Sequence, residues 1–158
     1  MTVGFTELTA ISEFNTGNVT PYNTPTLTAV ANRLYLILIH GQMVSTPRTL
    51  VSVTGGGLGT WTIIAGCSVV SANATRRSEA AYAWSASPGA GAAIAIEWSG
   101  GASGTGYSVY EITGFDTTTV IGQASSNTAT GTSGSATLPS ATAGSGIAAG
   151  LQQPANEV

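Results

Sequence analysis

Three segments of the sequence, 78–86, 92–100 and 106–114, alternate apolar or aromatic residues with small or polar ones. This period of two places successive side chains on opposite faces of an extended strand, whereas an amphipathic helix requires a period near 3.6. Helical periodicity is almost absent elsewhere, and Gly, Pro, Ser and Asn interrupt the β-branched and aromatic residues at short intervals. The pattern predicts an all-β protein, an antiparallel β-sandwich of the jelly-roll type with about eight to ten short strands.

The most apolar segment, LYLILI at 34–39, predicts a long central strand. Its even-numbered leucines would share one face, and its odd-numbered residues the other. Because a strand that is apolar on both faces must be covered on both, we expect it to lie between a core and a further sheet or subunit. The residues that we expect to pack in a core or interface are Tyr35, Ile37, Ile39 and Trp98, with Arg76 and Arg77 making polar contacts.

The length of 158 residues suits one domain. We expect 1–25 to form an N-terminal strand or arm and 26–119 to form the β-sandwich core. The remainder, 120–158, is rich in small polar residues and is expected to be an extended low-complexity segment, with a last strand at 147–153. The sequence therefore predicts a single sandwich with extended terminal arms.

The chain carries very little charge. Only 7% of the residues are charged, there is no lysine, and the net charge is −3. A nucleic-acid partner is not expected, because neutralising phosphates requires several clustered cations. Weak self-repulsion instead favours a subunit of an assembly. No apolar run is long enough to span a membrane, and the N-terminus lacks a basic region before an apolar core, so we expect neither a transmembrane segment nor a signal peptide.

The glycine-rich stretch VTGGGLGTWTIIAG, at 53–66, could suggest a phosphate-binding loop. Such a loop needs a helix after the glycines and, in its Walker form, a lysine followed by Ser or Thr. Here lysine is missing, the G-x-G-x-x-G spacing fails at Thr60, and a β-branched segment follows. The stretch instead predicts a hairpin turn with several residues at positive φ, in which Trp61 anchors the returning strand.

No catalytic, cofactor or metal site is predicted, and we expect the protein not to be an enzyme. Glu97 and Glu111 fall in strands expected to be adjacent and could form a glycosidase pair, but alternation favours their pointing to solvent. His40 could act in a Ser-His-Asp triad only with a suitable serine, but the sequence has no G-x-S-x-G motif of a serine hydrolase. Asp116 is its one aspartate. Cys67 lies in an apolar neighbourhood and is expected to be an inert thiol.

The three tryptophans leave two interpretations open. Each shares its strand face with apolar or aromatic neighbours, which favours core packing. An exposed aromatic platform on a sandwich would instead bind carbohydrate by stacking. The candidates for that role are Trp84, Trp98 and Tyr110.

Four motifs together resemble a module of known proteins. In order, these are TLTAVANRLYLILIHG, VSVTGGGLGTWTIIA, AAYAWSASPGAGAAIAIEWSG and YSVYEITGFDTT, within 26–119. The run resembles a β-sandwich module of bacteriophage virion proteins and, as a stand-alone chain, is most similar to a small capsid decoration (cement) protein. Gly59 is an insertion relative to the module's usual turn. The module's further strand pair has no counterpart before Val158, so we expect an open sheet edge that another subunit closes.

The resemblance implies a non-enzymatic structural role. A decoration protein of this kind would be a homotrimer on the outer surface of a virion, would bind the major capsid protein, and would stabilise the head by bridging capsid subunits. The alternative is a tail-fibre or other β-sandwich module that binds a carbohydrate or a receptor.

Overall fold

The computed structural model describes residues 3–12, 17–43, 46, 48–71, 75–127, 135–138 and 146. These residues contain nine strands and no helix. The predicted last strand at 147–153 lies outside the described residues. The strands are β1 (Gly4–Ser12), β2 (Tyr22–Leu27), β3 (Arg33–Gln42), β4 (Leu50–Gly55), β5 (Thr62–Ile63), β6 (Val69–Val70), β7 (Arg76–Ser85), β8 (Ala92–Trp98) and β9 (Gly104–Thr113).

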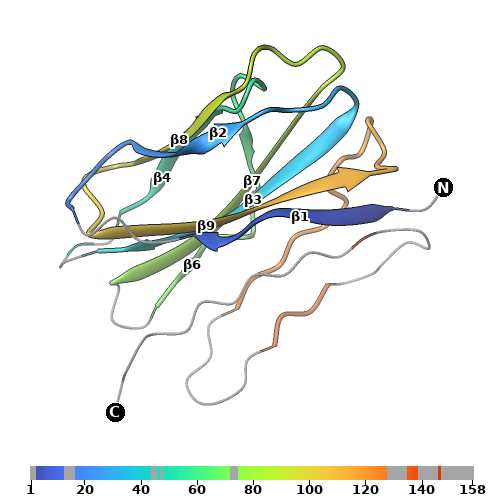
Figure 1. Ribbon diagram of the computed structural model, residues 1–158. Coiled ribbons are helices and arrows are strands. Elements are labelled where there is room, and N and C mark those ends of the chain that lie inside the picture. The colour runs from blue at the N-terminus through green and yellow to red at the C-terminus, as the bar shows by residue number, and fades with distance from the viewer. Residues whose placement is uncertain are drawn as a thin grey trace.

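The strands form two antiparallel sheets that pack face to face (Figure 1). The large sheet has the order β1-β9-β3-β7-β5, with β6 also paired to β7, and the small sheet has the order β2-β8-β4. The first strand pairs with the ninth, the second with the eighth and the third with the seventh. This is a long hairpin rolled across two sheets, which is the jelly-roll arrangement. The predicted all-β sandwich is confirmed, and 4–12 form an edge strand of it.

The core lies between the sheets. The odd-numbered face of β3 meets the even-numbered face of β8, and Val53 of β4 completes the contact. The alternation expected in β3, β8 and β9 therefore holds, because period-two patterning assigns each residue to one face. The most deeply buried of these side chains, each exposed by 2% or less, are Tyr35, Ile37, Ile39, Val53, Ile94, Ile96, Trp98 and Tyr107.

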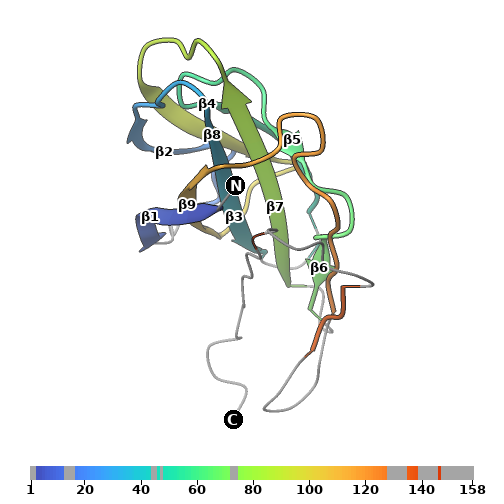
Figure 2. The ribbon, with the colours of Figure 1, turned by 90° about the vertical axis from the view of Figure 1, so that its right-hand side faces the viewer.

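The opposite, outer face of the large sheet carries a second apolar layer. Leu34 and Leu36 are buried there with Ile112, although no second sheet covers them. The cover is the segment 115–124 of the same chain (Figures 1 and 2), which contributes Phe115, Val120, Ile121 and Ala124. A further sheet or subunit was expected over this face of β3. At these residues the segment that follows β9 takes that place.

The glycine stretch forms the corner at which the chain changes sheets. Gly55, Gly56, Gly57 and Gly59 all have positive φ, between 67° and 95°, as predicted. The Trp61 indole N–H donates a hydrogen bond to the Gly55 carbonyl at 3.1 Å, which ties the returning chain to the turn. The turn closes with a Thr54–Thr60 bridge, but β4 belongs to the small sheet and β5 to the large one. The predicted hairpin turn is confirmed, and it also carries the chain from the small sheet to the large one.

Candidate functional site

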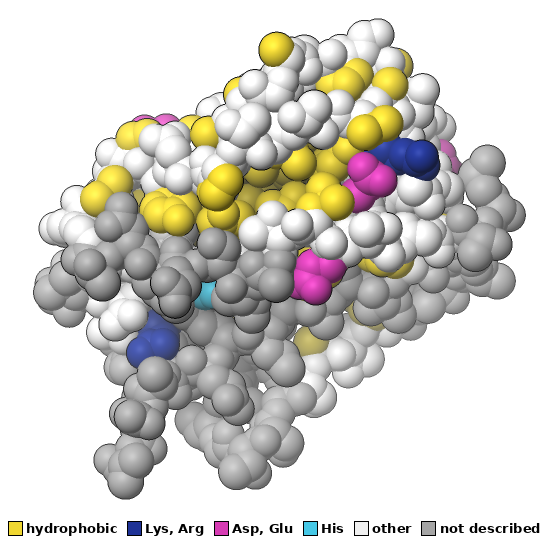
Figure 3. All heavy atoms as spheres, viewed as in Figure 1, with side chains coloured by type: hydrophobic (Ala, Val, Ile, Leu, Met, Phe, Trp, Pro, Cys, Tyr) yellow, Lys and Arg dark blue, Asp and Glu magenta, His cyan; other side chains and the backbone are white. Residues whose placement is uncertain are grey.

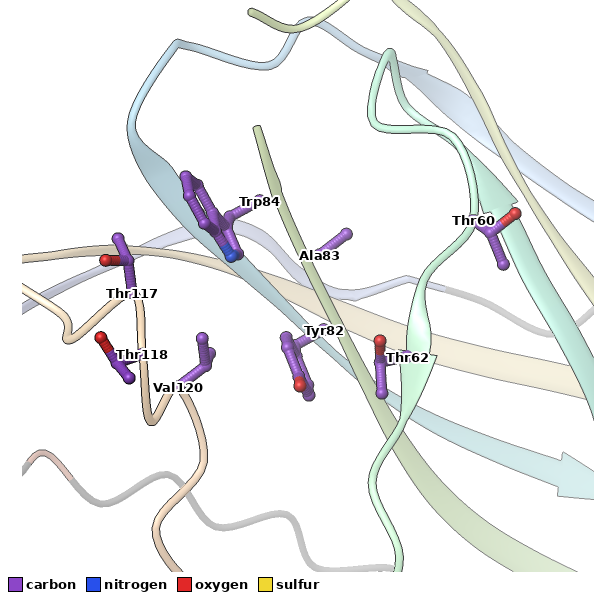
Figure 4. A pocket seen from close by; sticks show the side chains of 8 residues that line it. All are labelled: Thr60, Thr62, Tyr82, Ala83, Trp84, Thr117, Thr118 and Val120. Carbon is purple, nitrogen blue, oxygen red and sulfur yellow. The ribbon is translucent and has the colours of Figure 1, made fainter. Parts of the chain in front are cut away.

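An open trough with a volume of about 320 Å³ lies on the outer face of the large sheet (Figure 4). Its floor is the outer side of β7, with the rings of Tyr82 and Trp84. One wall comes from the chain around β5, and the other from the segment after β9. We call this hollow the β7 trough. The residues that line it are Thr60, Thr62, Tyr82, Ala83, Trp84, Thr117, Thr118 and Val120.

The floor follows from the alternation in β7. Ala81 and Ala83 are buried toward the core, so Tyr82 and Trp84 project to the outer face, where both are half-buried. The Trp84 ring packs edge-on against Phe115, with ring centroids 5.6 Å apart and an interplanar angle of 65°. This T-shaped geometry is favourable for aromatic pairs. The contact fixes the indole and joins the floor to one wall.

That wall is shaped by a turn after β9. The amide N–H of Thr118 donates a hydrogen bond to Asp116 Oδ1 at 2.7 Å. Asx turns of this kind hold irregular chain in one conformation. The amides of Thr118 and Thr119 lower the pKa of the Asp116 carboxyl, because they stabilise its charged form. The Asp116 carboxylate therefore holds the backbone of this wall in place by binding the amides of Thr118 and Thr119.

The trough is neutral and rich in hydroxyl groups. Four of the residues that line it are threonines, and none of the eight carries a charge. Nowhere in the described part of the chain do three or more His, Cys, Asp or Glu side chains group as metal ligands could. The trough therefore suits an uncharged ligand that has both an apolar face and hydroxyl groups.

Of the three aromatic residues suggested for sugar stacking, two lie on the outer face of the large sheet and one lies in the core. Trp84 lies in the trough. Tyr110 is on the same outer face, opposite Leu36, which is also the partner of Tyr82 on the other side of β3. Trp98 is only 2% exposed and donates its indole N–H to Thr105 Oγ1 at 3.0 Å inside the core. It is therefore removed from the stacking candidates, because a ligand could reach its ring only by opening the sandwich.

Tyr82 was not singled out as a stacking residue from the sequence. The signal was present, because alternation put it on the same face as Trp84, two positions away. Tyr82 becomes part of the trough because β5 pairs with β7, which places Thr62 beside Tyr82. That contact between distant parts of the chain was not readable from the sequence.

Glu97 and Glu111 do not form a pair. Because the chain changes sheets between β8 and β9, the expectation that these strands would be adjacent was wrong. Glu97 is exposed on the small sheet and accepts a hydrogen bond from Ser52 Oγ at 2.8 Å. Glu111 accepts one from the Tyr35 hydroxyl at 2.9 Å and pairs with Arg33 at 3.8 Å. The two carboxylates are therefore engaged at separate places.

The two adjacent arginines begin β7. Arg77 pairs with Glu79, and the Ser68 hydroxyl accepts a hydrogen bond from the Arg77 guanidinium at 2.6 Å. The carboxylate that pairs with Arg77 is therefore that of Glu79. Arg76 is half-buried at the start of β7, where its backbone N–H donates a hydrogen bond to Ser71 Oγ.

His40 and Cys67 are both half-buried. The His40 ring lies against the Cα of Gly106, where an added Cβ would approach Nε2 to 2.3 Å. Burial lowers the pKa of His40, which favours the neutral imidazole. Burial, with the nearby Glu79 carboxylate, raises the pKa of the Cys67 thiol. Both shifts favour the uncharged forms.

Two buried tyrosines provide a matched test of the polar contacts in the core. The Tyr35 hydroxyl accepts a hydrogen bond from the Val30 amide at 2.8 Å and donates to Glu111, whereas the buried Tyr107 hydroxyl has no partner in the described part of the chain. Burial raises the pKa of Tyr35, and the Glu111 carboxylate adds to this effect. Its hydroxyl therefore stays protonated at neutral pH and can donate to Glu111.

We expect Tyr35→Phe to lower the free energy of unfolding by about 1–3 kcal/mol, because it leaves the partly buried Val30 amide and the Glu111 carboxylate without this partner. Tyr107→Phe should change it by less than about 0.5 kcal/mol or stabilise the protein, since it removes an unpaired hydroxyl. Urea unfolding of both variants would measure the difference. Equal losses in the two variants would contradict this account.

No helix among the described residues is both long and apolar enough to cross a membrane.

Comparison of the chain with models of protein families, with curated proteins and with solved structures finds no match.

Proposed function

We propose that this protein is a non-enzymatic structural protein of a virion, a decoration protein that binds the outside of a capsid as a homotrimer and bridges capsid subunits. The similarity of 26–119 to a module of bacteriophage virion proteins supports this proposal. The observation that carries it is an apolar, solvent-exposed edge strand. Phe5 and Leu8 of β1 are 41% and 42% exposed, so this edge strand presents apolar surface that a partner could bury.

The surface around β1 is shaped for association. β1 and β2 are edge strands of the two sheets and run along the same side of the sandwich (Figure 1). On this side hydrophobic side chains are visible in the hollow between the sheets (Figure 3). A narrow cleft of about 50 Å³ lies there, lined by residues of both sheets that include Leu27, Ile94 and Val109. A partner that covers this side would bury apolar surface from both layers.

β1 is better suited than β2 to receive a partner strand. The register of β1 against β9 is regular from Gly4 to Glu7, and its bulges come only after Glu7. β2 contains Pro25, which cannot donate a backbone hydrogen bond, and its register shifts between Asn23 and Thr26. An edge strand with free backbone groups can pair with a strand of another chain. The low charge of the chain offers little repulsion to such pairing.

Light scattering coupled to size exclusion tests the proposal. The measured molar mass of the wild-type protein should be about three times that of its 15.7 kDa chain. The double variant Phe5→Ser/Leu8→Ser should dissociate at least about tenfold more readily, because it removes apolar surface from the interface. The control is Val51→Ser on β4, whose side chain is exposed by 52% but lies on the small sheet.

The control variant should keep the wild-type mass and the wild-type binding to heads assembled from the major capsid protein of the same virus. A wild-type protein that is monomeric at micromolar concentration and does not bind such heads would refute the proposal. Equal weakening by the β1 and β4 variants would show that β1 is not the contact strand.

A further inference from the structure

We propose that the β7 trough is a binding site for a neutral carbohydrate chain, with sugar rings stacked on Tyr82 and Trp84. The trough and the exposed edge of β1 are built from different residues. The inference therefore does not depend on how the protein assembles, and each proposal can fail without the other.

The floor offers two aromatic rings on consecutive outward positions of one strand. Residues two positions apart on a strand are separated by about 6.5–7 Å. At this spacing the rings of Tyr82 and Trp84 can contact adjacent parts of one extended ligand. Sugars present a face of C–H groups, and dispersion contacts between such a face and an aromatic ring are favourable. Trp61 and Trp98 are 3% and 2% exposed, so Trp84 is the tryptophan whose ring is accessible.

The walls provide the polar half of the recognition. Thr60 and Thr62 stand on one side of the floor, and Thr117 and Thr118 on the other (Figure 4). A threonine hydroxyl can both donate and accept a hydrogen bond, as a sugar hydroxyl can. No charged residue lines the trough, so an anionic sugar would find no counterion there. This lining matches a neutral glycan better than a charged one.

Strand pairing holds the floor of the trough, and local contacts hold one of its walls. β7 is paired with β3 on one side and with β5 and β6 on the other, so its backbone is held across the floor. The Trp84–Phe115 contact and the Asp116 turn hold the wall that follows β9. A volume of about 320 Å³ is at the small end of ligand pockets, which suits one or two rings of a longer chain. Preorganised sites of this kind lose little entropy on binding.

A proline-rich peptide is the competing ligand, since such peptides also dock on aromatic grooves. Threonine hydroxyls on both walls favour a ligand that carries many hydroxyl groups. A peptide in the polyproline conformation presents only backbone carbonyls as hydrogen-bonding groups. We therefore assign the trough to a glycan and treat the peptide as an outcome of the test.

The test begins with the purified full chain on an array of neutral and anionic glycans. The neutral glycans that bind are then titrated by calorimetry and by tryptophan fluorescence, which should respond because Trp84 lies in the site. Tyr82→Ala and Trp84→Ala should each weaken the affinity about tenfold. Trp84→Phe keeps a ring against Phe115 and should give a smaller loss, which guards against a variant that fails to fold. Thr62→Val is nearly isosteric and should weaken binding about threefold through the lost hydroxyl.

The double variant Phe5→Ser/Leu8→Ser is the matched control and should bind the glycan with wild-type affinity, whatever its oligomeric state. Thermal melting must show that each variant is folded. The proposal is overturned if no neutral glycan binds at millimolar concentration or if only anionic glycans bind. It is also overturned if folded Tyr82→Ala and Trp84→Ala bind as the wild type does, or if decaproline displaces the glycan and binds more tightly.

Discussion

Replacing Gly55 by alanine is expected to lower the free energy of unfolding by about 2–5 kcal/mol. Gly55 has φ of 95°, and a Cβ added there would lie 2.1 Å from the Ala93 carbonyl oxygen. That oxygen is held in place by the Gly56 amide at 3.2 Å, so it cannot easily move away. The loss combines about 1–2 kcal/mol for a non-glycine residue at positive φ with about 1–3 kcal/mol for overpacking. Urea unfolding followed by circular dichroism would measure it.

Gly59→Ala separates the two contributions. Gly59 also has positive φ, 75°, but an added Cβ there would meet no atom within 4 Å. Its substitution should therefore cost only the conformational part, about 1–2 kcal/mol. If the two alanine variants lose equal stability, close packing against the chain at Ala93 does not constrain the corner between the sheets.

Replacing Arg77 by alanine is expected to lower the free energy of unfolding by about 3–5 kcal/mol. The Glu79 side chain is 4% exposed, and Arg77 is the cation that pairs with it. Without Arg77, the hydroxyl of Ser68, which donates to Glu79 Oε1 at 3.0 Å, is left to stabilise a nearly buried carboxylate. Breaking a buried pair is costly because it leaves a charge out of water without a counterion. The measurement is again urea unfolding at neutral pH.

The double variant Arg77→Met/Glu79→Leu is the control for this prediction. Replacing both partners by apolar residues of similar size removes the charge as well as its counterion, so the change should be within about 1 kcal/mol of wild type or stabilising. If the double variant loses as much as Arg77→Ala, packing rather than the unpaired carboxylate explains the loss. If Arg77→Ala loses less than about 1 kcal/mol, the pair behaves as a surface ion pair.

Local features of the fold were readable from the sequence to different degrees. The faces of β3, β7 and β8 were predicted correctly, because alternation needs no knowledge of the partner strands. The positive φ values at the glycine corner and the anchoring by Trp61 were also predicted. The assignment of neighbours failed, as with Glu97 and Glu111, because adjacent segments of a jelly roll pass between sheets. The cover over Leu34 and Leu36 was missed for a similar reason, since 115–124 has no periodic pattern.

The residues of the candidate site were also only partly predicted from the sequence. Trp84 was identified from the sequence, because its position in an alternating strand allowed either a core or an exposed role. Tyr82 was not identified, and Trp98 was included although it is buried. Both outcomes depend on which face of each strand meets the other sheet, and alternation alone does not say which of the two faces that is.

The sequence by itself determined that this protein is all-β, which side chains share a strand face, and where its main glycine corner bends. These properties depend on residues within a few positions of one another, so local sterics and periodicity suffice. Only the tertiary structure decided that Thr62, Trp84 and Thr117 surround one trough, and that Phe5 and Leu8 remain exposed on an edge. These depend on contacts between segments far apart in the chain, which are determined by the path of the chain between the two sheets.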